Sequence, residues 1–485
     1  MSQVQKTISS LLAGMPSTDF PLSIAGHLVQ TPQRGEVINP ATGEVLVDYP
    51  MAGRQELETA VQCAKAAFAS WSGTPWEVRQ AKLVELADLI AARQEQFTRL
   101  LTLEQGKASS GAEWEIGGCI HWLREVAQQT LPQSVASEGE QGQVLCRHVP
   151  LGVVGAITPW NFPLLLAVWK VAPALLTGNT VVVKPSPYTP LCTLWFGELA
   201  QRVLPPGVLN IVAGGNELGQ WLTEHPDVSK IAFTGSTATG SRVMQSAAGN
   251  LKRVTLELGG NDPAIVLPDV DPKSIAEKLF WASFQNSAQF CVATKRLFIH
   301  ESIYDEVAEA LCEYAAGVKI GNGLEADTQL GPLQNQMQYD KVCDLIEDTH
   351  RAGLRFLAGG TVVHGNGYFI PITLVDNPPD DARCVVEEAF GPVLPLLKYR
   401  DVEEVIARAN NTEYGLAASV WGRDLAQAQA IAQRLEAGTV WINQVHQFSP
   451  HIAFGGHKQS GLGIENALEG LAEYTNVQTI MGRPL

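Results

Sequence analysis

The chain has 485 residues, of which 45% are hydrophobic and 17% charged, and it contains 44 glycines. This length exceeds what one hydrophobic core usually holds, so we expect at least two domains, and the composition excludes a disordered or fibrous protein. The net charge of −16 argues against a nucleic-acid partner, because phosphates demand a basic patch, and it favours a soluble cytoplasmic protein.

Cysteine usage and hydropathy narrow the class further. The eight cysteines form no C-x-x-C pair and no histidine lies at a spacing suited to zinc, so the sequence predicts a reducing compartment and no metal site. No basic segment followed by an apolar run opens the chain, which predicts no secretory signal. The longest apolar region, 151–183, is interrupted too often by residues such as Asn161, Pro163 and Lys170 to span a membrane.

The N-terminal region is predicted to be mainly helical. Residues 1–24 show no sustained period and are expected to form an extended lead-in, and residues 37–45 are predicted to turn between two strands. Apolar residues then recur at helical spacing. The predicted helices are 56–68, 78–93, 96–105 and 112–129. The composition of residues 131–149 shifts to Ser, Glu, Gln and Gly, and a strand is predicted at 144–149. This pattern fits a surface hairpin.

From residue 153 strands alternate with helices in the manner of a doubly wound parallel sheet. The predicted strands are 153–157, 180–183, 208–212 and 230–234, and the predicted helices lie near 164–177, 190–203, 217–224 and 236–247. The last of these strands runs into Gly235 and a helix, whose exposed N-terminal amides suit a pyrophosphate. Its sequence, GSTATG, matches neither G-x-G-x-x-G nor the Walker lysine motif, so this turn alone is a weak indication.

A second alternation of strands and helices begins after Gly260. The predicted strands are 264–266, 296–300, 367–374, 392–399 and 417–421, and the predicted helices are 272–281, 304–315, 335–352, 402–410 and 425–435, which lead to the stretch 438–443. This pattern predicts a second α/β domain. The cleft between two such domains is where substrate sites tend to lie.

The stretch 281–296, WASFQNSAQFCVATKR, places Cys291 just beyond a polar step. Amide and hydroxyl side chains compete for backbone hydrogen bonds, so such a step can end a helix and leave the thiol facing a cleft. A free cysteine is also commonly a buried small hydrophobe, and this stretch alone leaves both interpretations open. A nucleophilic thiol needs a base and an amide donor for the oxyanion. Glu257, before a glycine pair, and Asn161, between two apolar runs, can supply them.

Six motifs in one order resemble a known family. They are PWNFP at 159–163, FTGSTATG at 233–240, LELGGNDP at 256–263, Asn-x-x-Gln-x-Cys ending at Cys291, EEAFGP at 387–392 and FGGHKQSG at 454–461. On these motifs the chain is identified as a member of the NAD(P)-dependent aldehyde dehydrogenase superfamily, in its hydrolytic, non-CoA-acylating branch. The resemblance extends from residue 38 to the C-terminus.

The resemblance implies an aldehyde-dehydrogenase-like α/β fold. It comprises a Rossmann-type cofactor-binding domain (1–130 and 150–257), an α/β catalytic domain (258–470) and a small β oligomerisation arm (131–149 and 471–485). The arm implies a homodimer or homotetramer, with no nucleic acid or membrane as partner. The implied reaction oxidises an aldehyde to the carboxylic acid: the Cys291 thiolate attacks the carbonyl, hydride leaves to the nicotinamide, and water hydrolyses the thioester.

The family's catalytic roles fall on five residues. Asn161 and the Cys291 N–H would form the oxyanion hole, although Asn161 could instead cap the following helix. Glu257 would be the general base, with a pKa raised by its apolar strand end, or else a buried ion-pair partner. Lys170 and Glu465 match a proton relay, which a surface or interhelical salt bridge would explain almost as well.

The resemblance also assigns cofactor contacts. Lys184 is expected at the adenosine ribose, Trp160 and Ser236 at the ribose wall and pyrophosphate, and Glu388 and Phe390 at the nicotinamide ribose. The other implied positions are Ile157, Thr158, Pro159, Ser186, Pro187, Gly215, Gly219, Phe233, Thr234, Gly235, Leu258 and Gly259. Many NAD-preferring members carry glutamate where this chain has Pro187. No carboxylate there repels a 2′-phosphate, so we expect NAD with NADP also usable.

Six apolar residues occupy positions that line the substrate channel in the family: Phe162, Leu166, Trp169, Phe290, Phe448 and Phe454. With no Arg or Lys among them, they favour medium-chain aliphatic or aromatic aldehydes over semialdehydes bearing a carboxylate, although such rings are also ordinary core residues. A semialdehyde or CoA-acylating dehydrogenase and a non-catalytic cofactor-binding structural protein are the alternatives. The presence of Cys291, Glu257 and Asn161 argues against the CoA-acylating and non-catalytic ones.

Overall fold

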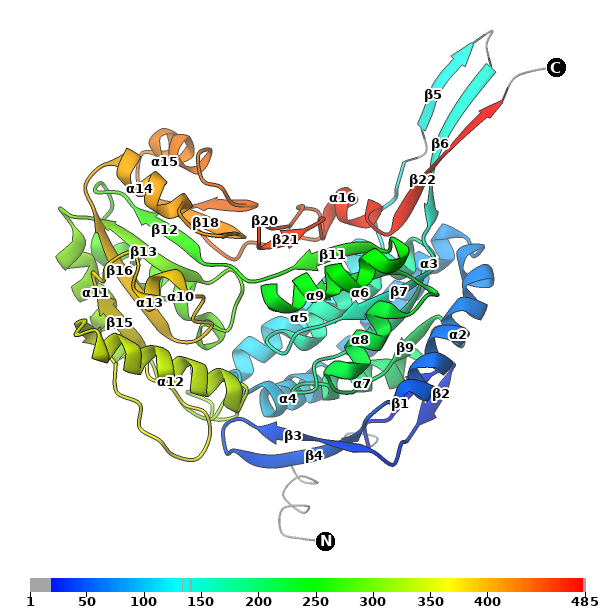
Figure 1. The fold of residues 1–485 in the computed structure, drawn as a ribbon, viewed down its shortest axis with the longest axis horizontal. Coiled ribbons are helices and arrows are strands. Elements are labelled where there is room, and N and C mark those ends of the chain that lie inside the picture. Colours follow the sequence, from blue (N-terminus) through cyan, green and yellow to red (C-terminus); the bar gives the residue numbers. More distant parts are fainter. Residues whose placement is uncertain (1–18, 133, 140–141, 483–485) are drawn as a thin grey trace.

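The computed structural model describes residues 19–132, 134–139 and 142–482. Most of the predicted lead-in, residues 1–18, lies outside this part of the chain. The described residues form two α/β bodies side by side, with a narrow β ribbon projecting from one of them (Figure 1). The predicted α/β class is therefore confirmed, and the described residues contain two large sheets.

The first body is built on an eight-stranded sheet of order β2-β1-β9-β8-β7-β10-β11-β21. Its parallel centre contains β7 (Val153–Ile157), β8 (Thr180–Lys184), β9 (Leu209–Ile211), β10 (Val228–Thr234) and β11 (Arg253–Glu257). The antiparallel edge strands are β1 (Leu22–Ile24), β2 (His27–Val29) and β21 (Gly461–Leu462). The strands β7, β8 and β10 are almost wholly buried, which explains their continuous Val, Ile and Ala runs.

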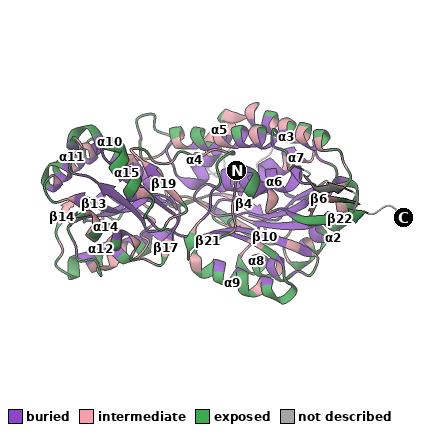
Figure 2. Ribbon diagram, turned by 90° about the horizontal axis from the view of Figure 1, so that it is seen from above, coloured by how far each residue is buried: buried purple, intermediate pink, exposed green. Residues whose placement is uncertain are grey.

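Helices cover both faces of this sheet (Figure 2). On one face lie α2 (Arg54–Ser72), α8 (Asn216–Glu224) and α9 (Thr237–Ala247). The other face carries α6 (Pro163–Leu176) and α7 (Leu191–Ala200), with α3 (Trp76–Ala91), α4 (Gln94–Gln105) and α5 (Ser109–Val126) packed outside them. Because α6 lies between the sheet and these outer helices, every one of its residues is buried.

The second body has a seven-stranded sheet of order β14-β15-β16-β13-β12-β18-β19. Its strands are β12 (Asp262–Val266), β13 (Thr294–His300), β14 (Phe356–Ala358), β15 (Thr373–Asp376), β16 (Val393–Tyr399), β18 (Ala417–Trp421) and β19 (Thr439–Ile442). One face is covered by α10 (Pro272–Phe284) and α11 (Tyr304–Ala316), and the other by α12 (Gln336–Arg351), α13 (Arg383–Val386), α14 (Val402–Asn410) and α15 (Leu425–Ala432).

One strand prediction is wrong in part. Residues 367–372, predicted as the start of a strand, form none, and β15 begins only at Thr373. Gly367 takes φ +81°, and the Tyr368 N–H donates to the Pro40 carbonyl of the N-terminal hairpin instead of to a neighbouring strand. Pro371 has no N–H to donate.

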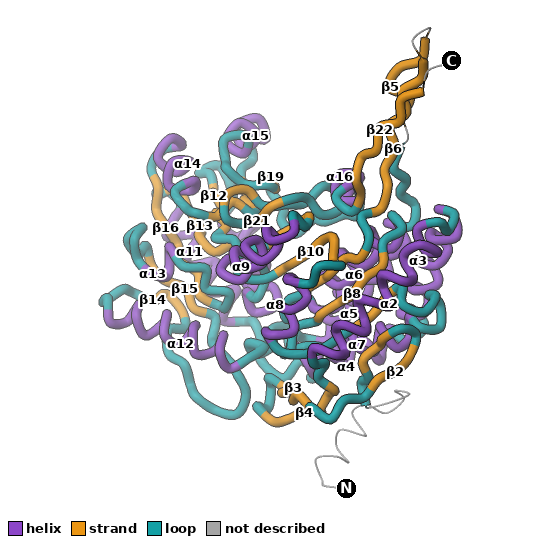
Figure 3. The backbone as a smooth tube through the Cα atoms, turned by 45° about the vertical axis from the view of Figure 1, so that its right-hand side comes forward, coloured by secondary structure: helices purple, strands orange, loops and turns teal. Residues whose placement is uncertain are grey.

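The projecting ribbon is a three-stranded sheet of order β22-β6-β5 (Figure 3). It contains β5 (Ser134–Gly139), β6 (Gly142–Pro150) and β22 (Thr475–Gly482), and its register runs from Thr475 opposite Pro150 to Gly482 opposite Gln143. Two shorter ladders complete the fold: β3 (Arg34–Asn39) with β4 (Glu44–Pro50), and β17 (Tyr414–Gly415) with β20 (His457–Lys458). The last helix is α16 (Ala467–Ala472).

The chain returns from the second body to the first after β19. There β21 pairs with β11, placing Gly461 opposite Glu257, and the backbones of Phe454 and Glu465 exchange two hydrogen bonds. This return brings the FGGHKQSG segment and Glu465 beside α6. Within the described ranges, no helix combines the length and apolar composition needed to cross a membrane.

Candidate active site

The nucleophile segment begins where α10 stops. After Phe284, Asn286, Ser287 and Ala288 take left-handed backbone angles, with φ of 55°, 56° and 61°. Such angles are unfavourable for residues other than glycine and tend to cluster at functional sites. The Ser287 hydroxyl donates to the Gly331 carbonyl at 2.7 Å and the Gln289 amide to the Asn286 carbonyl at 2.9 Å, which holds the turn. As predicted, the polar step ends the helix just before Cys291.

The Cys291 thiol is half-buried. Burial raises its pKa to about 12, opposed by the positive charge of Lys295 and reinforced by the carboxylates of Glu257, Asp262 and Glu388. The thiolate, not the thiol, is the nucleophile. Without a further positive influence or a base, this thiol therefore stays protonated at neutral pH.

Asn161 lies directly against the nucleophile segment. Its Nδ2 donates to the Gln289 carbonyl at 3.0 Å, and Asn286 Nδ2 donates to the Asn161 carbonyl at 3.2 Å. The alternative in which Asn161 caps α6 is wrong, because the amides of Leu164 and Leu165 donate to Glu115 Oε1 at 3.1 and 3.3 Å. The Asn161 side chain is thus directed toward the cysteine turn.

Two buried charged residues, which the sequence analysis did not predict, support the backbone of Asn161. Lys107 Nζ forms a 2.6 Å ion pair with Glu115 Oε2 and donates to the Asn161 carbonyl at 2.9 Å. The same ammonium lies 3.9 Å from the centroid of the Phe162 ring. Lys107 and Glu115 belong to stretches with an ordinary amphipathic pattern, where charged residues are normally solvated, so the sequence offered no signal for their burial.

Glu257 ends β11 and is buried. Burial raises its pKa well above the usual range, the negative charge of Glu465 adds to this, and Lys170 opposes it. Its Oε1 has no hydrogen-bond partner in the part of the chain that the structure describes. Among these residues Glu257 forms no ion pair, so the alternative role as an ion-pair partner is not found there.

Lys170 and Glu465 form the buried ion pair instead. Lys170 Nζ lies 2.5 Å from Glu465 Oε1 and donates to Thr234 Oγ1 at 2.7 Å. Their side chains are 0% and 2% exposed, so a surface salt bridge is excluded. A structural ion pair and a proton relay would both place Lys170 and Glu465 in this contact.

The predicted cofactor residues gather at the carboxyl ends of neighbouring strands, where ligands bind in open α/β sheets. Ile157 lies opposite Lys184 and Phe233, and Thr234 lies opposite Glu257. The remaining positions follow these strand ends: Thr158, Pro159 and Trp160 after β7, Ser186 and Pro187 after β8, Gly235 and Ser236 after β10, and Leu258 and Gly259 after β11.

Local features at these ends fit a dinucleotide. Ser236 caps α9 by accepting from the Thr239 N–H at 3.3 Å, and the N-terminus of this helix, the end that favours an anion, borders a cleft. Burial lowers the pKa of Lys184 to about 8, and its stem runs beside Gly219 on α8, the helix that Gly215 caps. A Cβ on Gly219 would lie 3.5 Å from Lys184 Cδ.

A cleft of about 880 Å³ separates the two bodies. Ser236 and Thr237 line its wall on the first body, and Glu388 lines the wall on the second. Glu388 Oε1 accepts from the Gly260 N–H at 3.0 Å, while the Phe390 ring packs edge-on against Trp160 at 5.3 Å. Ser236, predicted at the pyrophosphate, and Glu388, predicted at the nicotinamide ribose, therefore line the same cleft.

The predicted substrate residues form one aromatic cluster. Phe162 contacts Phe290 at 4.6 Å between ring centroids, and Phe290 lies 6.1 Å from Phe448. Phe448 and Phe454 each lie edge-on to Trp169, at 6.1 and 5.8 Å. Leu166 is buried one turn before Trp169 on α6. The cluster thus continues from the residue next to Cys291 to the loop after β19.

Further rings extend this cluster and were missed, among them Trp114, which packs edge-on to Phe162 at 6.0 Å. Trp122 stacks on Trp169 at 5.1 Å, Trp441 packs edge-on to Phe448 at 5.8 Å, and His446 lies 4.6 Å from Phe290. Burial lowers the pKa of His446 to about 4, so its ring is neutral.

Two arginines, one in the stretch 281–296 and one in α13, could bind a substrate carboxylate only if their guanidinium groups were free. Arg296 donates to three backbone carbonyls, and Arg383 pairs with Asp344 and Glu387. The guanidinium groups of both arginines are therefore engaged with other partners, away from the aromatic cluster. The cation found at the cluster is Lys107, which Glu115 already neutralises.

Comparisons with known proteins agree with this geometry. Residues 28–480 match the model of the aldehyde dehydrogenase family. The chain is 41% identical to a putative aldehyde dehydrogenase, FUS7, of Gibberella fujikuroi over 91% of this chain and 94% of that protein. It is 40% identical to phenylacetaldehyde dehydrogenase of Pseudomonas fluorescens over 98% of both. The NAD⁺ complex of aldehyde dehydrogenase from Bacillus cereus superposes with a TM-score of 0.95, at 36% identity and 98% coverage of both chains. The predicted family, fold and enzyme class are confirmed, and the chain belongs to the aldehyde dehydrogenase family.

Proposed function

We propose that this chain oxidises an apolar aldehyde to the carboxylic acid with NAD as hydride acceptor, through a thioester on Cys291. The observation that carries the proposal is the grouping of three residues around one turn: the half-buried Cys291 thiol, the Asn161 amide held against that turn, and Glu257, whose charge acts on the thiol and whose Oε1 has no partner among the described residues. NAD is favoured because the strand ends and the N-terminus of α9, which borders the cleft, fit a dinucleotide, and because the similar Bacillus cereus enzyme binds NAD⁺.

Each residue then has a defined task. Cys291 Sγ attacks the carbonyl carbon, and the Asn161 amide with the Cys291 N–H donates to the developing oxyanion. An amide nitrogen carries two hydrogens, so Asn161 can keep its bond to Gln289 and still donate a second one. When bound, NAD accepts the hydride. Glu257, once deprotonated, takes a proton from the water that attacks the thioester, and Lys170 with Glu465 passes that proton onward.

The substrate class follows from the aromatic cluster. Each buried methylene contributes roughly 0.8 kcal/mol, so two more carbons should raise kcat/KM about tenfold until the channel is filled. A second, unpaired carboxylate would cost several kcal/mol to bury. We therefore expect kcat/KM to rise along a series of straight-chain aldehydes and to be high for phenylacetaldehyde, as followed by NADH absorbance. A best substrate of the succinic semialdehyde type would refute this, and no NADH with any aldehyde would refute the activity itself.

Cofactor choice should depend on position 187. The Tyr49 hydroxyl donates to the Pro187 carbonyl at 3.2 Å, a contact that another residue can keep, and Lys184 has no carboxylate partner in the part of the chain that the structure describes. Pro187→Glu should raise the ratio of kcat/KM for NAD over NADP by about tenfold or more, because like charges near a protein surface repel by a few kcal/mol. Pro187→Gln is the matched uncharged control. An unchanged ratio in the glutamate variant would show that this position does not set the preference.

We propose further that the protein forms a homo-oligomer in the cytoplasm. Val477, Ile480 and Met481 are exposed along β22, which fits pairing of the ribbon with a second copy in a homodimer or homotetramer. All eight cysteines are free, which fits the reducing cytoplasm. A monomer by light scattering would contradict the assembly.

A further inference from the structure

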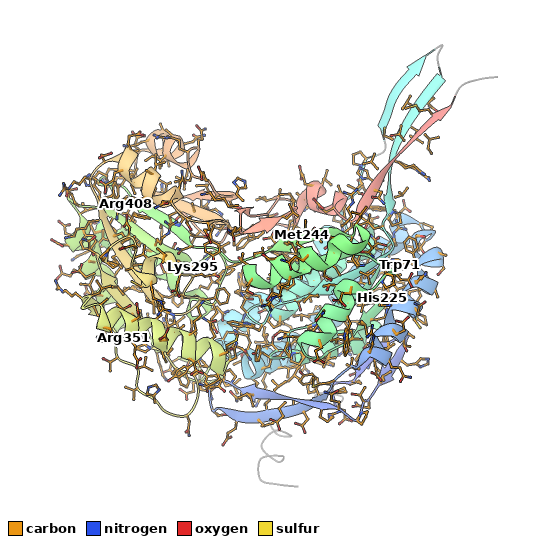
Figure 4. The ribbon with its side chains drawn as sticks, in the orientation of Figure 1. Trp71, His225, Met244, Lys295, Arg351 and Arg408 are labelled. Atoms are coloured by element: carbon orange, nitrogen blue, oxygen red, sulfur yellow. The ribbon has the colours of Figure 1, made fainter. Side chains whose placement is uncertain are left out.

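Lys295 is a buried cation beside the nucleophile that neither the family motifs nor the roles above use. It is the second residue of β13, its side chain is 5% exposed, and it lies at the inner side of the second body (Figure 4). Its Nζ donates to the carbonyls of Cys291, Phe290 and Ala293 at 2.5, 3.1 and 3.4 Å. Glu388 Oε1 lies 3.4 Å from the same ammonium.

These contacts fix the direction of the peptide groups around the nucleophile. No described peptide bond is cis, and in a trans peptide the C=O of one residue and the N–H of the next point in opposite directions. Since Lys295 binds the Phe290 carbonyl, the Cys291 N–H is directed away from the ammonium. The Phe290 carbonyl also accepts from the Ala293 N–H at 3.1 Å, which closes the turn on the same side.

The charge of Lys295 acts on the thiol as well. It is the one group that lowers the pKa of Cys291, against burial and the carboxylates of Glu257, Asp262 and Glu388. Asp262 is buried beside it, and burial raises the pKa of that carboxyl to about 7, with Lys295 as the main opposing influence. Loss of the ammonium would therefore remove the positive charge that opposes these three carboxyl groups at the thiol.

We propose that Lys295 is a positioning residue, which grips the carbonyls of the Cys291 turn, so directing the Cys291 N–H to the oxyanion, and favours the thiolate by its charge. This inference rests on the proposed function of Cys291 as nucleophile. It differs from a merely structural tether, because a tether would affect thermal stability without changing the reactivity of the thiol in the free enzyme.

The test compares Lys295→Met and Lys295→Arg with the surface control Lys319→Met, whose lysine pairs only with Glu325 and Asp327 on an exposed loop. The first readout is alkylation of Cys291 by iodoacetamide as a function of pH without NAD, mapped by peptide mass. The second is the rate of the NADH burst with saturating aldehyde and NAD.

In Lys295→Met the alkylation profile should move to higher pH, and the burst rate should fall about tenfold to a hundredfold. Full loss of an oxyanion donor costs about 10²–10³, and a misdirected donor retains part of its effect. Lys295→Arg should keep the alkylation profile but not the full burst rate, since a planar guanidinium cannot place one donor among three carbonyls. The control should match the wild type in both.

A wild-type burst rate in Lys295→Met overturns the inference, as does one in Lys295→Arg if the methionine variant does not fold. An unshifted alkylation profile in Lys295→Met overturns the electrostatic part. Failure of the inference is distinct from failure of the proposed function: if Cys291→Ala still turns over, Cys291 is not the nucleophile, whatever Lys295 does.

Discussion

Cys291→Ala should abolish NADH formation, with turnover reduced by about 10⁴-fold or more, as expected when a covalent nucleophile is removed. The variant should still fold and bind NAD. A half-buried thiol contributes little packing, so the free energy of unfolding should change by no more than about 1 kcal/mol. Steady-state absorbance measures the first effect, and thermal unfolding with a fluorescence titration of NAD measures the others.

The matched control is Cys312→Ala. Cys312 is also half-buried, but its Sγ contacts the Leu357 carbonyl on the far side of the second body, away from the cleft. This variant should keep wild-type turnover. If Cys291→Ala retained even a tenth of the wild-type rate, the nucleophile would have to be sought elsewhere.

Glu257→Gln should separate the two halves of the reaction. Thioester formation does not need the general base of hydrolysis, so a nearly stoichiometric burst of NADH is expected. Steady-state turnover should then fall by about 10²–10⁴-fold, the usual contribution of a general base. Rapid mixing resolves the burst, and Glu301→Gln, in a surface pair with Arg400, is the control.

The pKa of Glu257 gives this prediction a pH signature. Burial and Glu465 raise that pKa, so the carboxylate form that acts as base is lost as pH falls through the raised value. In the wild type, thioester hydrolysis should therefore accelerate as pH rises through this raised pKa. The glutamine variant should lose this dependence. Full steady-state activity in Glu257→Gln across neutral pH would exclude the assignment.

The sequence predicted much of the fold because the periodicity of apolar residues agrees with the observed burial along most of the chain. The continuous apolar runs of β7, β8 and β10 and the helical spacing of α2 to α5 were sufficient for that. The pair of β11 with β21 was missed, since a two-residue strand has no period, and residues 367–372 were misassigned because a tertiary contact to Pro40 took the place of a ladder.

The residues of the site likewise divide into those that the sequence predicts and those that it does not. Cys291, Asn161 and Glu257 carry chemistry in recognisable motifs, and the structure brings them together. Lys107, Glu115 and Lys295 do not stand out, because nothing local distinguishes a lysine that binds buried carbonyls from one in solvent. Likewise, the left-handed backbone of Asn286 to Ala288 depends on partners such as Gly331, far away in sequence.

The return of the chain through β21 has a consequence for biosynthesis. Domains generally fold from the N-terminus as they leave the ribosome, but the first body here is completed by residues near the end of the chain. Until Gly461 and Glu465 emerge, the edge of β11 is open and buried Lys170 has no counterion. A nascent chain that lacks these residues therefore leaves the edge of β11 unpaired and free to pair with another strand.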